Sequence, residues 1–225
     1  MRAAGTRLPR TRRPLLRAGA LVALGGALAA CVPRVRPLTG APVAPATLPR
    51  LVLSPTRERL VFRWRYEEEG FSARGDGAAR VAPLDSARLD FFLDGGYGGG
   101  WAVLIGETVR TPPGSVGRRL IPPGPMLWAA LGRLSVPGAV DTTVRALGDT
   151  LRADLTAGRD EAWRVTAAAG SLTGLERLRG GRVVERVSRD SARVRYEDLA
   201  GRRSLAIDIQ RRESANAFPP DIWIP

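Results

Sequence analysis

Apolar and polar residues alternate along much of the chain, which is the period of a β-strand with one buried face. The pattern is strongest where Leu60, Phe62, Trp64 and Tyr66 fall at every second position among mostly polar neighbours. Similar segments follow, separated by turn residues. The predicted strands of this first group are residues 60–67, Phe71–Val81, Ala87–Leu93 and Trp101–Val109. They predict an antiparallel meander.

A second group of strand patterns follows residue 150, with glycine-containing turns between its members. Its segments are Leu151–Thr156, Ala162–Ala168, Leu172–Arg179, Val183–Ser188, Ala192–Asp198 and Ser204–Gln210. Strands spaced about ten residues apart without a long helix between them are typical of a continuous antiparallel sheet. We therefore predict a mainly β (α+β) fold, in which a curled antiparallel sheet forms an open half-barrel with a short helical lid.

A helical pattern interrupts the strands at Pro125–Leu134. A proline in the first turn and Pro137-Gly138 after the last turn are typical start and stop signals. The lid residues that we predict are Leu127, Trp128 and Leu131, because a short and very apolar helix between two sets of strands must cover apolar surface.

Large aromatic side chains fall on the apolar faces of the predicted strands. They are Phe62, Trp64, Phe91, Trp101 and Trp163. One short helix is little cover for so much apolar surface, and a partly open concave apolar surface is by default a ligand site. We predict that these residues line a hydrophobic cavity. The alternative is that they are ordinary core residues and that the helix plugs the space completely.

The start of the chain has the order of a secretory signal. An arginine-rich segment without acidic residues precedes the apolar run Ala18–Ala30, which is shorter than the roughly 20 residues of a membrane-spanning helix. The run ends in Leu28-Ala29-Ala30-Cys31, which resembles the bacterial lipobox. That resemblance implies cleavage before Cys31 and acylation of its side chain. The alternative is a plain signal peptide or an uncleaved anchor.

We predict three regions: a lipoprotein signal peptide at 1–30, the lipidated Cys31 with a proline-rich tether at 31–56, and a folded domain at 57–225. Leu51–Leu53 could instead form an edge strand against the domain. Residues 11–17 also resemble a twin-arginine export signal. Val32 follows Cys31, at the position where an aspartate would resemble an inner-membrane retention mark. The absence of that aspartate favours the outer membrane.

Composition excludes most catalytic and metal chemistry. The 225 residues include no histidine, no lysine and a single cysteine. The sequence therefore lacks the residues for histidine or cysteine metal sites and for Schiff-base lysines. It also lacks Ser-His-Asp and Cys-His nucleophiles. Only a carboxylate pair, as in glycoside hydrolysis, is left, and no acidic residue stands out for that role. We expect a protein that is not an enzyme and that has no cofactor or metal.

The positive charge of +13 does not indicate nucleic acid binding. Six of the 35 basic residues precede Cys31, so 29 basic residues stand against 22 acidic ones after it, a balance of +7. These arginines alternate with acidic and apolar residues instead of gathering in one block, and the predicted destination lies outside the cytoplasm.

Three short motifs occur in the predicted strands between residues 71 and 93: Arg74-Gly75-Asp76-Gly77, Arg80-Val81-Ala82-Pro83 and Arg88-Leu89-Asp90-Phe91-Phe92. They resemble the second and third strands of the LolA/LolB lipoprotein-localisation family. The order of a lipobox, an aromatic first strand, these motifs, an apolar helix and further strands also matches. The resemblance implies an open half-barrel that binds the acyl chains of lipoproteins beneath a helical lid, and the lipobox favours the lipid-anchored receptor type.

Two positions depart from that family pattern. Ala82 stands where the soluble carrier often has an arginine that ties down the lid. The loop that would touch the membrane offers only Tyr97 among glycines, and tyrosine suits a membrane interface.

The partners that the resemblance implies are membrane lipid, through acylated Cys31, and acyl chains or lipoproteins as ligand. The implied location is the bacterial cell envelope, at the outer membrane facing the periplasm. The alternative is a structural or protein-interaction lipoprotein with a filled core and an unknown protein partner.

Overall fold

The computed structural model describes residues 32–95, 98–113 and 120–224. The chain forms two compact units, Met1–Pro33 and Arg34–Pro225. The predicted signal peptide and Cys31 lie outside the described residues, as does Tyr97. Within the described part of the chain, no helix has both the length and the apolar character needed to span a membrane.

The described residues of the second unit form one sheet of 13 strands, with every pair antiparallel. The strands are β1 Ala41–Val43, β2 Arg57–Glu68, β3 Phe71–Ala82, β4 Ser86–Leu93, β5 Gly99–Ile105, β6 Thr108–Arg110, β7 Asp141–Leu147, β8 Thr150–Thr156, β9 Glu161–Ala168, β10 Ser171–Arg179, β11 Arg182–Arg189, β12 Arg193–Asp198 and β13 Arg203–Ala215. The helices are η2 Pro45–Thr47, α3 Gly124–Leu131 and η3 Pro220–Trp223.

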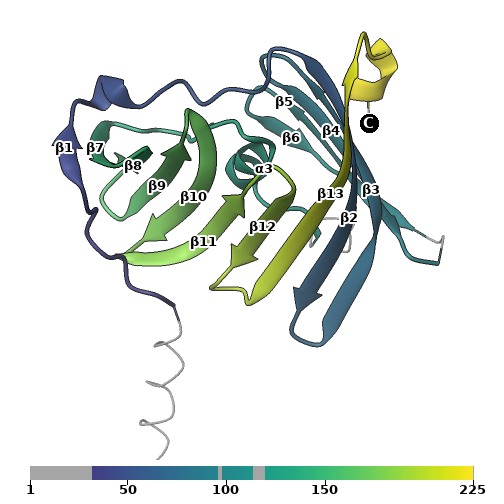
Figure 1. Ribbon diagram of the computed structural model, residues 1–225. Coiled ribbons are helices and arrows are strands. Elements are labelled where there is room, and N and C mark those ends of the chain that lie inside the picture. Colours follow the sequence, from purple (N-terminus) through teal and green to yellow (C-terminus); the bar gives the residue numbers. More distant parts are fainter. Residues whose placement is uncertain (1–31, 96–97, 114–119, 225) are drawn as a thin grey trace, which may run out of the picture. The chain divides into compact units, whose positions relative to one another are not determined.

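The sheet curls around α3 without closing into a barrel (Figure 1). Its spatial order is β1-β7-β8-β9-β10-β11-β12-β13-β2-β3-β4-β5-β6, so β1 and β6 are the two free edges. Two meanders, β2–β6 and β7–β13, join through the long pairing of β13 with β2, which runs from Ser204 opposite Glu67 to Ala215 opposite Arg57. The predicted fold, an open antiparallel half-barrel with a short helix, is confirmed.

The predicted alternation in β2 is confirmed, because Leu60, Phe62, Trp64 and Tyr66 all lie in the core. The stretch predicted as a single strand at Trp101–Val109 is instead two strands, β5 and β6, separated by a turn at Gly106. The strands β1 and β7 were not predicted. In β7 only Val144 is fully buried, so its sequence carries little of the apolar alternation on which the prediction depends.

Most of the predicted tether at 31–56 belongs to the folded unit, which corrects that boundary. Arg34 forms an isolated bridge with Arg182 in β11, and β1 pairs with the edge strand β7. Leu51 and Leu53 are buried in the core, and the Leu134 amide donates to the Leu51 carbonyl at 2.8 Å. The physical reason is that β1 covers an open sheet edge while the leucines gain apolar burial.

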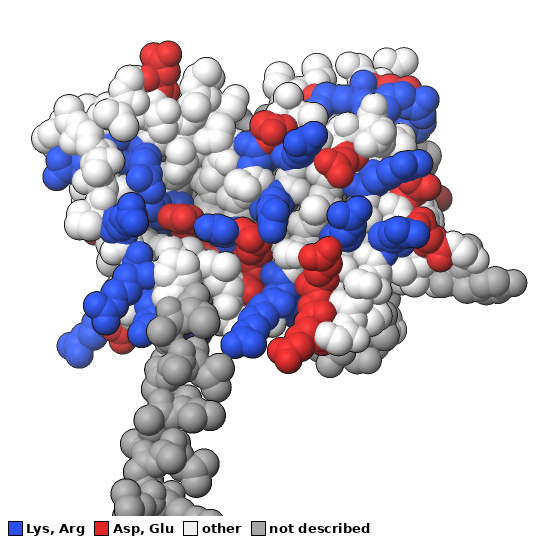
Figure 2. Space-filling view, turned by 60° about the horizontal axis from the view of Figure 1, so that its bottom comes forward, with Lys and Arg blue, Asp and Glu red and all other residues white. Residues whose placement is uncertain are grey.

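Arginines and carboxylates interleave on the face shown in Figure 2 instead of forming patches of one sign. Many of them are cross-strand ion pairs, such as Arg63 with Asp76 and Arg80 with Asp90. One pair is bidentate and joins a buried arginine to a half-buried aspartate. Arg164 contacts both carboxylate oxygens of Asp154, at 2.7 and 2.8 Å, and also donates to the Arg36 carbonyl at 2.6 Å. Exposed pairs contribute only about 0–1 kcal/mol each. The arrangement gives a mixed surface, as the sequence predicted.

Candidate ligand site at the helical lid

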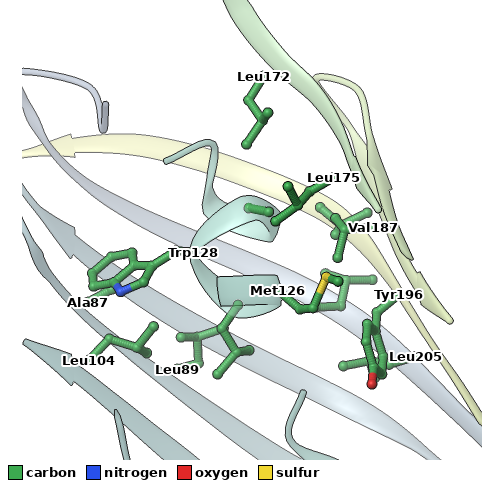
Figure 3. Close-up of a cluster of buried hydrophobic side chains, with 14 of the residues drawn as sticks. Ala87, Leu89, Leu104, Met126, Trp128, Leu172, Leu175, Val187, Tyr196 and Leu205 are labelled. Atoms are coloured by element: carbon green, nitrogen blue, oxygen red, sulfur yellow. The ribbon is translucent and has the colours of Figure 1, made fainter. Parts of the chain in front are cut away.

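The helix α3 lies inside the curve of the sheet and is buried on more than one side. Its four consecutive residues Met126, Leu127, Trp128 and Ala129 are at most 1% exposed. Figure 3 shows Trp128 directed toward Ala87 and Leu104 of the first meander. Met126 points the opposite way in that view, toward Tyr196 and Leu205. The helix therefore bridges the two meanders instead of covering one face of the sheet.

Local sequence explains where α3 begins and ends. Pro125 lies in its first turn, where a missing amide costs no helical hydrogen bond, and the helix stops at Gly132. Gly132 has a φ of 98°, in the left-handed region that glycine adopts without strain, and its amide bonds the carbonyls of the last turn. The helix is consequently shorter than the predicted Pro125–Leu134.

Trp128 anchors the helix to the first meander. Its indole Nε1 donates to the Gly106 carbonyl at 2.9 Å, in the turn between β5 and β6. The guanidinium of Arg133 lies 4.5 Å from the indole ring centre and covers it. Of the predicted lid residues, Leu127 and Trp128 are fully buried, whereas Leu131 is half-buried and borders a surface groove.

Four of the five predicted cavity residues lie in the continuous hydrophobic core. Phe62, Trp64, Phe91 and Trp163 are between 1 and 3% exposed. The ring of Phe91 packs edge-on against both Phe62 and Trp64, with centroid distances of 5.6 and 5.7 Å. Phe62, Trp64 and Phe91 pack on one another, and all four residues belong to the same core as the helix residues, so in this conformation the concave face is filled.

Trp101 lies on the other face of the sheet, which corrects its placement among the cavity residues. It stands opposite Asp90 in the pairing of β4 with β5 and is only half-buried, with the Arg88 guanidinium 6.0 Å from its ring. Ala102 and Leu104 occupy the core side of β5 instead. Because both alternating sets of β5 contain apolar residues, periodicity alone did not identify the inner set.

A groove of about 400 Å³ opens beside the C-terminal end of α3. Three parts of the chain form it: the segment Val52–Pro55, the helix end Ala130–Gly132, and the strand ends that meet there. The strand residues are Glu58, Leu60, Val81, Ser171, Leu172, Arg189, Ile209 and Arg212. The sequence did not indicate this groove, because its walls come from segments spread over more than 150 positions of the chain.

Two arginines and one glutamate provide the charge in this groove. Arg212 Nη1 lies 2.6 Å from Glu58 Oε2 and forms an ion pair. Arg189 Nη1 donates to the Leu172 carbonyl at 3.2 Å, and its Nε is buried without a hydrogen-bond partner among the described residues. Burial, and to a smaller degree the charge of Arg212, lowers the pKa of Arg189 below its ordinary value.

A polar network lies on the inner face of the strands β9, β10, β11 and β12. The Tyr196 hydroxyl donates to Glu185 Oε1 at 2.6 Å, and Arg177 contacts Glu161 and Glu185 at 2.7 and 3.1 Å. Burial raises the pKa of Tyr196 above its ordinary value. The carboxylates of this network accept from arginine or tyrosine donors. Among the described residues, no group of three or more potential metal-ligating side chains could hold a metal ion.

Comparison with known proteins identifies the fold. No family model matches the chain, and no curated protein matches it. A solved structure of a LolA superfamily protein from Nitrosomonas europaea matches with a TM-score of 0.53 at 10% identity, covering 81% of this chain and 98% of that one. A DUF1329 family protein from Desulfovibrio piger has a TM-score of 0.46 at 8% identity, covering 76% and 90%.

A third solved structure, a domain described as an outer membrane lipoprotein-sorting protein from Vibrio parahaemolyticus, has a TM-score of 0.38 at 8% identity over 76% of this chain and 90% of that one. At such low identity, the match to the LolA superfamily protein shows the fold alone. The chain has a LolA/LolB-like fold, as its three strand motifs predicted.

Proposed function

We propose that this chain is a non-enzymatic envelope lipoprotein that binds acyl chains between α3 and the curved sheet. The proposal places the protein at the outer membrane, facing the periplasm and anchored through Cys31, with a role in lipoprotein localisation. The observation that carries it is the construction of the lid. One helix of eight residues fills the space between two meanders, and a groove opens beside its C-terminal end.

The chemistry of α3 supports displacement by an acyl chain. The contacts of Met126, Leu127 and Trp128 with the sheet are almost entirely apolar, apart from the single bond from Trp128 to Gly106. An acyl chain that entered at the groove would replace those contacts with equivalent apolar ones. Burial contributes about 25 cal/mol per square ångström whichever apolar group supplies the surface. The exchange between lid and ligand therefore costs little.

The first prediction tests acyl binding directly. We expect the full chain carrying Cys31→Ser, purified without detergent, to retain co-purified lipid detectable by native mass spectrometry. Ala130→Trp places a large ring at the half-buried helix end that lines the groove, so it should remove most of that lipid. Ala200→Trp adds the same ring at an exposed position between β12 and β13, outside the groove, and should leave binding unchanged.

Circular dichroism would show that each variant is folded. A folded parent protein without lipid, which also takes up none when it is incubated with palmitate, would contradict the acyl-binding proposal.

The second prediction concerns the anchor. We expect Cys31 to incorporate labelled palmitate in a bacterial host and to direct the protein to the membrane fraction. Cys31→Ser should abolish labelling completely, because this is the only thiol in the chain. Labelling that persists in this variant, or a wild-type protein that stays unlabelled, would contradict lipidation at this residue.

The filled concave face favours a second candidate function. Phe62, Trp64, Phe91 and α3 already bury one another, so the same fold could serve as a rigid structural or protein-interaction lipoprotein. This alternative predicts an empty protein in the mass spectrometry experiment. It also predicts that Ala130→Trp has no effect on function beyond its effect on stability.

A further inference from the structure

Arg189 is the charged side chain of the groove that has no counter-ion. Among the described residues, no carboxylate lies within ion-pair distance of its guanidinium, whereas Arg212 beside it is paired with Glu58. A guanidinium that is largely removed from water without an anionic partner is electrostatically costly. Such an arrangement is expected where a ligand supplies the missing charge.

The hydrogen bonds of Arg189 leave a defined part of the side chain available. Nη1 is engaged by the Leu172 carbonyl, and no described residue accepts from Nε. Nη2 also makes no hydrogen bond to a described residue, so it is the donor that a ligand carboxylate in the groove would meet first. Nε lies on the same edge of the guanidinium plane but is buried, and it would have to turn toward the groove to reach the second carboxylate oxygen. The end of α3 also comes close to the guanidinium, because a Cβ atom at Gly132 would lie 2.5 Å from Arg189 Nη1.

The other charged groups around Arg189 favour a single negative charge. Arg212 repels the guanidinium, while Glu58 and Asp190 attract it more weakly. The Glu58 carboxylate is bound by Arg212. A ligand carboxylate at Arg189 would therefore meet one unpaired cation beside an already neutralised ion pair, which suits a monoanion better than a group with two negative charges.

We propose that the groove binds a free long-chain fatty acid, with its carboxylate on Arg189 and its acyl chain along Leu60, Leu131 and Leu172. The inference rests on the proposed acyl-binding function and adds the chemistry of the head group. The volume of about 400 Å³ lies within the range of about 300–1,000 Å³ for small-molecule sites. The acyl groups of a lipoprotein amino terminus carry no such carboxylate, so the site would distinguish the two kinds of ligand.

Equilibrium dialysis of the full chain carrying Cys31→Ser at pH 8 tests this assignment. The probes are radiolabelled palmitate and the uncharged hexadecanol, which have the same chain length. We expect palmitate to bind the parent protein about ten-fold or more tightly than hexadecanol, since bonds between charged groups are the strong ones. Arg189→Gln should remove that preference and leave hexadecanol binding unchanged.

Two further variants separate a head-group role from a structural one. Arg189→Lys keeps the charge but lacks the planar edge, so it should bind palmitate with intermediate affinity. The matched control is Arg145→Gln, because Arg145 is also half-buried and donates Nη1 to a backbone carbonyl, that of Gly40, but lies outside the groove. It should bind both probes as the parent does.

Each other outcome overturns a stated part of the inference. Equal binding of palmitate and hexadecanol by the parent would remove the head-group assignment and leave the acyl-binding function standing. Failure to bind either probe would overturn both. If 1-palmitoyl lysophosphatidate bound more tightly than palmitate and lost that affinity in Arg189→Gln, the ligand would be a phosphate lipid and the carboxylate assignment would be wrong.

Discussion

Trp128→Ala is expected to lower the free energy of unfolding by about 3–5 kcal/mol, the range for truncating a fully buried tryptophan. The side chain is 1% exposed, its indole donates to the Gly106 carbonyl, and Arg133 packs on its ring. Removal would leave a cavity between α3 and the first meander, and the Gly106 carbonyl would keep only the longer bond from Arg133 Nη1, at 3.4 Å. Urea denaturation followed by circular dichroism would measure the loss.

Trp101→Ala is the matched control for this experiment. Trp101 is half-buried on the outer face, with the Arg88 guanidinium 6.0 Å from its ring, so we expect its removal to cost about 1 kcal/mol. The two variants delete the same side chain, one from the helix α3 inside the curve of the sheet and one from the outer face of β5. Equal losses would contradict the assignment of Trp128 as the residue that holds the lid.

Gly75→Ala is expected to destabilise the protein by about 3 kcal/mol, at the upper end of the range for adding atoms to a packed site. A Cβ atom at this position would lie 1.8 Å from the carbonyl oxygen of Phe92 in β4. Because the obstacle is backbone and not a flexible side chain, β3 and β4 would have to separate. Thermal and urea denaturation would show the change as a lower midpoint.

Gly174→Ala provides the matched control in β10. Its added Cβ would meet the Val187 carbonyl oxygen at 3.5 Å, which is ordinary contact, and its φ is not in the left-handed region. Replacing such a glycine restricts the unfolded chain, so we expect no loss or a gain of about 0.4–1 kcal/mol. A comparable loss in both variants would contradict close approach of the strands as the reason for glycine at residue 75.

The close approach at Gly75 also explains why the motif Arg74-Gly75-Asp76-Gly77 contains glycines. Gly77 faces the ring of Phe62, whose atoms would lie 2.2 Å from an added Cβ, and Gly75 lies against β4. The two glycines let the large aromatic side chain of β2 and the backbone of β4 come close to β3. A short motif therefore indicated the fold although sequence identity with the solved structure is only 10%.

The strand pattern predicted the sheet where one alternating set is apolar and the other is charged, as in Leu60–Tyr66. It placed Trp101 on the wrong face, because β5 is apolar at both sets of positions and the choice depends on its pairing with β4. It also missed the folded part of the tether, since Leu51 and Leu53 occur in a proline-rich stretch without periodicity.

The candidate site was predictable only in part. The lid helix and its buried Leu127 and Trp128 follow from local signals of proline, apolar residues and glycine. The charged groove does not, because Glu58 and Arg189 are separated by more than 100 positions and each is an ordinary strand residue when read alone. The tertiary structure brings them together, and no local pattern records that proximity.

The bridge between Arg34 and Arg182 limits how far the folded unit could move from a lipid anchor. If Cys31 carries the acyl groups, as proposed, only Val32 and Pro33 separate it from the first paired residue. Three Cα–Cα steps reach at most about 11 Å, roughly a third of the hydrocarbon core of a bilayer. Such a protein would have no long flexible linker with which to extend across the periplasm. Any cargo would have to be delivered to it at the membrane surface.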